Sequence, residues 1–200
     1  MCCQGAERTR TIPAAEVDQS ILTTLSHQGT ATSKVISHID LTKPFGTVAQ
    51  WTLVVVQEGG LPPTQNEDHG PILVCLVKAT TPDCDQYQYL YRNRSSEPSW
   101  FDTLCHLLAS SIVYAGRNRS RPFLLVKVCT AESFNDNCGI ATALYRYDRQ
   151  ANRFARVFHN ITGRNNNQDT RFVESGPIQG DVIVDYPTVH APYTYWIEVY

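Results

Sequence analysis

Six short runs of β-branched and aromatic residues dominate this chain, and each is bounded by glycine, proline, asparagine or aspartate. Runs of this length and chemistry are typical of β-strands. They predict a predominantly antiparallel β-rich α+β domain, built either as a sandwich or as propeller-like hairpin units. The predicted strands lie at residues 48–57, 72–80, 123–130, 140–147, 181–186 and 193–200.

The chain is long enough to form one domain with a sizeable core. Its 200 residues, 42% of them hydrophobic and 18% charged, exclude a disordered chain, a collagen-like repeat and a coiled coil. A domain of this size buries enough apolar surface to fold without disulfide bonds. No run approaches the roughly 18 unbroken apolar residues of a membrane-spanning helix.

Two segments, 14–27 and 101–115, place apolar side chains three or four positions apart, which predicts helices. The second segment has the wider apolar face and is bounded by proline and glycine, so we expect the main helix there. Residues 1–13 are mostly polar and lack this periodicity, which predicts a disordered N-terminal tail. The remaining residues, 14–200, form the single predicted domain.

An internal repeat runs through the middle of the chain. At an offset of 54 residues, Cys75 matches Cys129 and Cys84 matches Cys138. The tripeptide Leu-Tyr-Arg also recurs after each second cysteine, and these matches exceed what average composition produces in so short a stretch. The repeat predicts two related β-hairpin units. The units cover residues 71–118 and 123–165.

The paired cysteines predict one disulfide across each hairpin, Cys75 to Cys84 and Cys129 to Cys138. Each bridge closes a loop of about ten residues and stabilises the fold by roughly 2.5–3 kcal/mol in the chain-entropy model. Structural zinc prefers cysteines two to four residues apart, so these spacings do not favour a metal site. Disulfides persist in oxidising compartments, so we expect the protein to lie outside the cytoplasm.

The N-terminus lacks the basic and apolar regions of a secretory signal peptide. We interpret the chain as starting at or near a mature terminus, with Cys2 as the lipid-modified residue of a bacterial outer-membrane lipoprotein. Membrane contact is expected only through this lipid anchor. The alternative is a misassigned start codon, with Cys2 and Cys3 as ordinary thiols. The expected location is the bacterial periplasm or the outer membrane.

Positive charge is concentrated in residues 92–171, which carry a net charge of +6 while the rest of the chain carries −8. Two Gly-Arg-Asn turns contribute Arg117 and Arg164 to this region. Clustered arginines suit an anionic glycan or a protein partner in the cell envelope. The alternative is a solvated surface whose arginines pair with acidic segments of the same chain. A pI near 6.3 and the expected compartment disfavour nucleic acid as a partner.

Asn165, Asn166 and Asn167 extend the second of these turns into a dense cluster of hydrogen-bonding side chains. Surface loops often carry binding residues, so we predict ligand contacts there. The alternate Asn and Asp positions resemble the start of an EF-hand calcium loop, but the glycine and the final glutamate of that loop are missing. The alternative is a turn whose Asn side chains hydrogen-bond their own backbone. No metal ion is predicted.

The last eight residues alternate side chains at strand spacing. This alternation places Trp196 and Tyr200 on one face and Ile197 and Val199 on the other. We expect one face to join the core. If the other face is exposed, Trp196 and Tyr200 form an aromatic strip that binds sugar rings or anchors a protein interface. The alternative is that these aromatic side chains only pack inside the fold.

The sequence carries no recognisable catalytic or cofactor motif. The six histidines show no HExxH spacing, and Gly-x-Ser-x-Gly, P-loop and GxGxxG patterns are missing. Cys105 and His106 are adjacent, but successive side chains on a helix point about 100° apart and do not form a catalytic dyad. Asp181 and Asp185 on one strand face would be about 13 Å apart, too far for a retaining glycosidase pair. We predict no catalytic residue and no cofactor.

These features favour a binding protein over an enzyme. We predict an extracytoplasmic binding protein of the periplasm or envelope that acts by protein–protein contact, as an inhibitor or an immunity-type protein. One alternative is an envelope hydrolase that acts on glycans or peptides. A second alternative is a structural or adhesive envelope component that uses the aromatic C-terminal strand.

Overall fold

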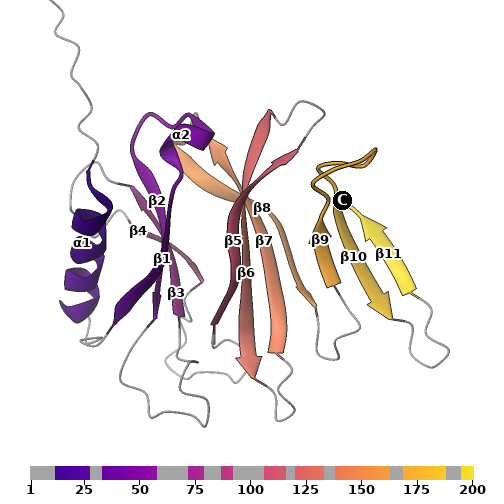
Figure 1. Ribbon diagram of the computed structural model, residues 1–200, viewed down its shortest axis with the longest axis horizontal. Coiled ribbons are helices and arrows are strands. Elements are labelled where there is room, and N and C mark those ends of the chain that lie inside the picture. The colour runs from indigo at the N-terminus through magenta and orange to yellow at the C-terminus, as the bar shows by residue number, and fades with distance from the viewer. Residues whose placement is uncertain are drawn as a thin grey trace, which may run out of the picture.

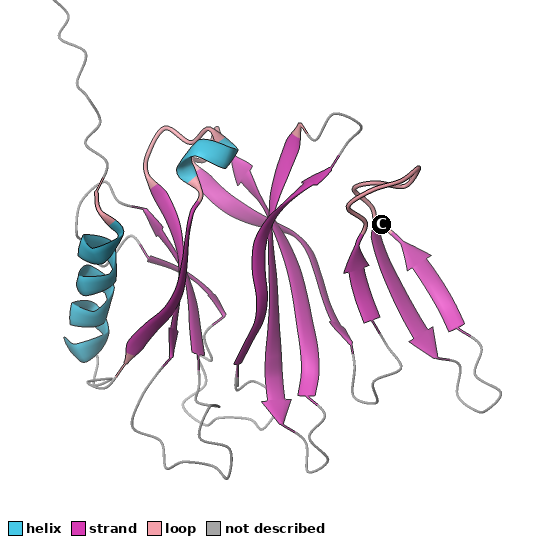
Figure 2. Ribbon diagram, viewed as in Figure 1, coloured by secondary structure: helices cyan, strands magenta, loops and turns pink. Residues whose placement is uncertain are grey.

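A computed structural model places two helices and eleven strands within the residues that it describes. The described ranges are 12–27, 33–57, 72–78, 87–91, 106–115, 120–132, 138–162, 169–187 and 195–200. The strands form three antiparallel sheets (Figure 2), which confirms the predicted antiparallel, β-rich character. Within these ranges the sheets do not close into a barrel or a propeller.

Each sheet consists of strands that follow one another along the chain. The N-terminal sheet contains, in spatial order, β1 (Lys34–Asp40), β2 (Trp51–Gln57), β3 (Ile72–Lys78) and β4 (Tyr87–Tyr91). The central sheet contains β5 (His106–Ala115), β6 (Arg121–Glu132), β7 (Cys138–Asp148) and β8 (Arg153–Thr162). The C-terminal sheet has β10 (Val182–Pro187) in the middle, with β11 (Tyr195–Val199) and β9 (Asp169–Phe172) at its edges.

Two helices accompany the N-terminal sheet. Helix α1 (Ala14–His27) has the bounds that its apolar spacing predicts, and it buries Val17 and Ile21 against the sheet. Helix α2 (Thr42–Phe45) is a single turn between β1 and β2. It ends at Gly46, whose φ of 57° lies in the left-handed region that glycine adopts without strain.

The layers follow one another in the order α1, N-terminal sheet, central sheet, C-terminal sheet (Figure 1). In β2, Val54 faces α1 whereas Val55 faces the central sheet. Because β2 is covered on both faces, its middle residues, 53–56, form a continuous apolar run without polar alternation. On the far side of the central sheet, Val184 of β10 packs in one cluster with Leu125 and Leu144.

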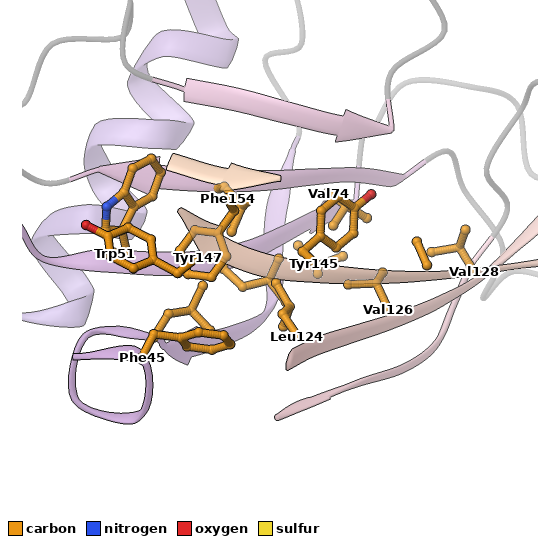
Figure 3. Close-up of a cluster of buried hydrophobic side chains, with 14 of the residues drawn as sticks. Phe45, Trp51, Val74, Leu124, Val126, Val128, Tyr145, Tyr147 and Phe154 are labelled. Carbon is orange, nitrogen blue, oxygen red and sulfur yellow. The ribbon is translucent and has the colours of Figure 1, made fainter. Parts of the chain in front are cut away.

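Aromatic rings fill one end of the core between the N-terminal and central sheets (Figure 3). The ring of Phe154 on β8 is fully buried, with centroid distances of 4.9 Å to Phe45, 5.5 Å to Trp51 and 5.4 Å to Tyr147. Tilted and edge-on contacts of this kind stabilise aromatic clusters beyond the area that they bury. The cluster therefore joins α2, β2, β7 and β8.

The turn between β7 and β8 adds a polar link between the same two sheets. Asn152 has a φ of 45°, and its side-chain Oδ1 accepts a hydrogen bond from the hydroxyl of Tyr147 at 2.6 Å. The same oxygen accepts a longer bond, at 3.4 Å, from the indole Nε1 of Trp51. Asp148 begins this turn and accepts hydrogen bonds from two of its backbone N–H groups. Asn152 thus connects the turn to β2 across the core.

The helix predicted at 101–115 is wrong, because the described part of this segment is strand β5. β5 pairs with β6 along its length. Ile112 packs toward the N-terminal sheet and Val113 toward the C-terminal sheet, so apolar side chains on both faces of the strand contact a neighbouring layer. A strand covered on both faces needs no alternation, and β-branched residues favour the extended chain. Residues 101–105 lie outside the described ranges.

The two predicted hairpin units, 71–118 and 123–165, do not superimpose in their strand pairing. Cys75 on β3 pairs with Tyr89 on β4. An equivalent register would pair Cys129 with Ala143, but Cys129 pairs with Ile140. In addition, β3 is the third strand of its sheet and β6 the second. A common origin of the two units stays a hypothesis drawn from the sequence.

The end of the predicted N-terminal tail belongs to the fold. The backbone N–H of Ile12 donates to the side-chain oxygen of Gln50 at 2.7 Å, and the Gln50 amide donates to the Ile12 carbonyl at 2.8 Å. The Ile12 side chain packs against the cluster beneath α1. The boundary at residue 13 is therefore corrected for Ile12, while residues 1–11 lie outside the described ranges.

Candidate functional site

The strand β11 and the adjoining Tyr200 expose large apolar side chains at the outer end of the layered fold (Figure 1). The exposed fractions are 71% for Trp196, 64% for Ile197, 56% for Val199 and 62% for Tyr200. Large apolar side chains on both faces are thus more than half exposed, so the expectation that one face is buried in the core is wrong. The cause is the place of β11 at the edge of a three-stranded outermost sheet, where β10 is the one described strand that adjoins it.

The hydrogen-bonding pattern shows which backbone groups of β11 point outward. Val182 and Tyr200 exchange two backbone hydrogen bonds, each of 2.9 Å. In an antiparallel ladder such pairs alternate, so Glu198 also directs its N–H and C=O toward β10. Ile197 and Val199 therefore direct their backbone groups to the open side. No described strand pairs with that side.

The other sheet edges carry features that discourage a further strand, whereas β11 does not. The pairings of the edge strands β1, β4, β5 and β8 each contain a register shift. Edge strand β9 carries the charged Asp169 and Arg171. The β10–β11 register is unbroken, and Glu198 is the one charged residue of β11. Bulges and charges are the usual protection of edges, so β11 is the least protected edge of the described sheets.

The two faces of β11 differ in what lies beside them. Tyr200 shares a face with Val182 and Val184, and its ring contacts Phe158 of β8 at a centroid distance of 5.4 Å. The Tyr200 hydroxyl donates a hydrogen bond to the Glu198 carboxylate. Ile197 lies on the opposite face, which no other described layer covers. The aromatic side chains predicted to bind a partner are thus exposed, and the ring of Tyr200 also packs against Phe158.

Charged groups gather at the other edge of the same sheet. The Lys127 ammonium donates to the carbonyl of Thr170 at 2.6 Å and lies 3.8 Å from the Asp169 carboxylate, which also pairs with Arg171. Burial raises the pKa of Asp169, but the hydrogen bond from Arg171, the two positive charges and the Thr170 N–H together lower it overall. The side chain of Asp185 accepts the backbone N–H of Asp169 at 2.6 Å. These contacts tie β9 to β6 and β10 and keep Asp169 ionised.

The described arginines of the predicted basic region are all exposed, and two of them act on the carboxylate of Asp148. Asp148 lies at the β7–β8 turn, next to the exposed Arg146 and Arg153. The backbone N–H of Ala151 lowers the pKa of Asp148 most; burial opposes this shift, and the Gln150 N–H and the charges of Arg153 and Arg146 add to it, so that the pKa is lowered overall. The proximity of an acidic group of the same chain to exposed arginines agrees with the alternative of a solvated surface. The exposed arginines are Arg121, Arg146, Arg149, Arg153, Arg156 and Arg171.

The cysteines differ from the predicted pattern. Cys75 is a buried thiol beneath α1, which corrects the predicted bridge to Cys84; Cys84 itself lies outside the described ranges. The strand register explains the difference, because Cys75 lies opposite Tyr89 and not beside the turn. Cys129 is disulfide-bonded. Its bridge to Cys138 stays a prediction, since nothing of the Cys138 side chain is described.

The remaining predicted site residues lie outside the described ranges. They are Cys2, Arg117, Arg164, Asn165, Asn166 and Asn167. Of the predicted partner-binding residues, Trp196 and Tyr200 alone can therefore be placed, four positions apart on one face of the chain end. The structure adds Ile197 and Val199, which the sequence pattern assigned to the core or to the far face. The strand-like alternation of these side chains is visible in the sequence. Nothing in the neighbouring residues indicates that β11 is an edge strand.

The described residues hold no group of three or more His, Cys, Asp or Glu side chains placed to bind a metal ion. Neither described helix is long and apolar enough to span a membrane. Comparison with protein-family models, with curated proteins and with solved structures finds no match to this chain. The function must therefore be argued from the chemistry of the site itself.

Proposed function

We propose that this chain is a binding protein that acts by protein–protein contact, and that β11 is the strand to which a partner adds an extended segment. The observation that carries this proposal is the outer edge of β11, which pairs with no described strand, has no bulge and exposes large apolar side chains on both faces. In strand addition, backbone hydrogen bonds supply affinity and the alternating side chains supply specificity. Ile197 and Val199 offer the backbone groups, while Trp196 offers the exposed aromatic anchor of the kind found in interface hot spots.

The rest of the fold suits a rigid support for this edge. We propose that the N-terminal and central sheets act as a β-sandwich scaffold, with the C-terminal sheet as the presenting layer. An inhibitor or immunity-type protein of the periplasm or envelope needs such a preformed surface, because a rigid surface loses little entropy on binding. The disulfide at Cys129 supports an oxidising compartment. The lipid anchor at Cys2 remains part of this proposal.

The described carboxylates do not favour the hydrolase alternative. Asp169 and Asp185 are cross-strand neighbours, but the backbone N–H of Asp169 and the nearby cations occupy their oxygens. A general acid needs a raised pKa, whereas that of Asp169 is lowered. Asp181 directly precedes β10, whereas Asp185 lies within the strand, four residues further along the chain.

Affinity purification from a bacterial envelope extract tests the proposal. The wild-type chain and Ile197→Lys are immobilised in parallel, with Val48→Lys as the matched control because Val48 is a still more exposed apolar residue, at 87%, in the turn before β2. We expect a stoichiometric protein partner on the wild type and on Val48→Lys, and its loss from Ile197→Lys, since a charge on an open edge discourages strand pairing. Equal retention by all three chains would place the contact elsewhere. Turnover of a substrate without any retained partner would overturn the proposal.

A further inference from the structure

We propose that the strand that completes the β11 edge is β11 of a second copy of this chain. Two copies would then join their three-stranded C-terminal sheets into one continuous sheet around a two-fold axis. This inference rests on the proposed function, because both require the open side of β11 to accept a strand. It goes further by naming the occupant.

The backbone alternation supports such self-pairing. Around a two-fold axis through Ile197, Ile197 meets Ile197 of the partner subunit, and Val199 meets Tyr195 of the partner subunit. Ile197 and Val199 direct their N–H and C=O groups outward, and Tyr195 lies opposite Pro187, a residue with no N–H to donate. At each of these positions, a residue whose backbone groups point away from β10 therefore pairs with another such residue of the partner subunit. All five residues of β11 find a partner in this register.

Charge selects the same register. An axis through Glu198 would set two carboxylates directly opposite one another, which destabilises a sheet. An axis through Ile197 instead sets Glu198 opposite Trp196 of the partner subunit, and no like charges meet. It also sets the β-branched Ile197 against its own copy, a favourable cross-strand pair. The register centred on Ile197 thus gives full overlap of the five strand residues and sets no like charges opposite one another.

The size of the contact limits its strength. A single pair of short strands buries less than the roughly 1,200 Å² at the lower end of stable specific interfaces. We therefore expect a reversible dimer with a Kd in the micromolar range. The side chains of Ile197 and Val199, both more than half exposed in the single chain, would be the ones most covered.

Sedimentation velocity over a concentration series tests the dimer on the full chain. We expect the wild type and the Val48→Lys control to dimerise, and Ile197→Lys and Ile197→Glu each to raise the Kd at least tenfold, because two like charges meet on the axis. An equimolar mixture of Ile197→Lys and Ile197→Glu should restore dimerisation, since opposite charges then face each other. Restoration in the mixture is expected only if residue 197 lies on the axis.

Amide hydrogen exchange supplies a second readout that does not depend on substitutions. As the protein concentration rises through the Kd, exchange should slow at Ile197 and Val199 but not at Glu198, whose N–H already bonds to β10. A wild type that stays monomeric, or a dimer that Ile197→Lys leaves intact, would overturn the self-pairing. If that monomer still binds a different protein in a manner sensitive to Ile197→Lys, the proposed function stands without the dimer. If it binds none, both fail.

Discussion

Replacing Asn152 with alanine is expected to lower the free energy of unfolding by about 3 kcal/mol. Asn152 combines a left-handed backbone with a side-chain oxygen that accepts hydrogen bonds from Tyr147 and Trp51. Alanine removes this acceptor, and it also enters the left-handed region less readily than asparagine does. The substitution therefore weakens the turn and the link between two sheets at once.

Two contributions account for this magnitude. The Tyr147 residue is 9% exposed, so leaving its hydroxyl without the 2.6 Å bond costs about 1–3 kcal/mol. The 3.4 Å bond from Trp51 is long and contributes less. The left-handed backbone adds about 1 kcal/mol for alanine. In a chain of this length the total lowers the Tm by roughly 6–12 °C.

Denaturant unfolding of three variants separates the two contributions. Asn152→Gly keeps the backbone unstrained and loses only the acceptor, so it should cost about 2 kcal/mol. Asn152→Asp keeps an acceptor oxygen and should stay within about 1 kcal/mol of the wild type. Equal losses for alanine and glycine would refute the backbone contribution. A loss for aspartate as large as that for alanine would refute the role of the side-chain oxygen.

Substitutions elsewhere test the core, a turn and an ion pair. Phe154→Ala is expected to lower the free energy of unfolding by about 3–5 kcal/mol in denaturant unfolding, because three aromatic rings surround this side chain. Phe154→Leu should lower it clearly less. Similar losses for the two variants would contradict close packing there. Gly46→Ala should cost about 1 kcal/mol and Gly46→Asn less, owing to the φ of 57°, and identical Tm values would remove that reason. The lowered pKa of Asp169 means that its carboxylate stabilises the fold above its ordinary pKa, and that this stabilisation is lost as the pH falls through the lowered one. The free energy of unfolding should then fall more steeply below about pH 4 in the wild type than in Asp169→Asn, and parallel curves would argue against the ion pairs.

Local chemistry was sufficient to predict several elements. The apolar spacing of 14–27 predicted α1 with its observed bounds, and the β-branched runs at 72–80 and 140–147 predicted β3 and β7 closely. In these segments the period or the side-chain type points to one structure only. Strands β1 and β8 were not predicted, since charged and polar residues interrupt their apolar pattern.

The helix prediction for 101–115 failed for a different reason. Its leucines at three- and four-residue spacing fit a helix face, yet β5 is covered by layers on both sides. Burial on both faces removes the polar alternation by which a strand is normally recognised. The disulfide prediction for Cys75 and Cys84 also rested on sequence spacing alone. That spacing does not determine the strand register, which sets Cys75 opposite Tyr89.

By itself, the sequence determined that this chain is an antiparallel β-rich protein with a strand near residue 200 that carries Trp196, because strand propensity is carried by each residue and its near neighbours. Tertiary structure alone decided which strands are covered on both faces and which sheet edge is left without a described partner strand. Strand order and layer stacking depend on pairings between distant segments, and no local pattern encodes them. For that reason Val55 is buried while Val199, in an equally strand-like setting, lies on the open edge of β11.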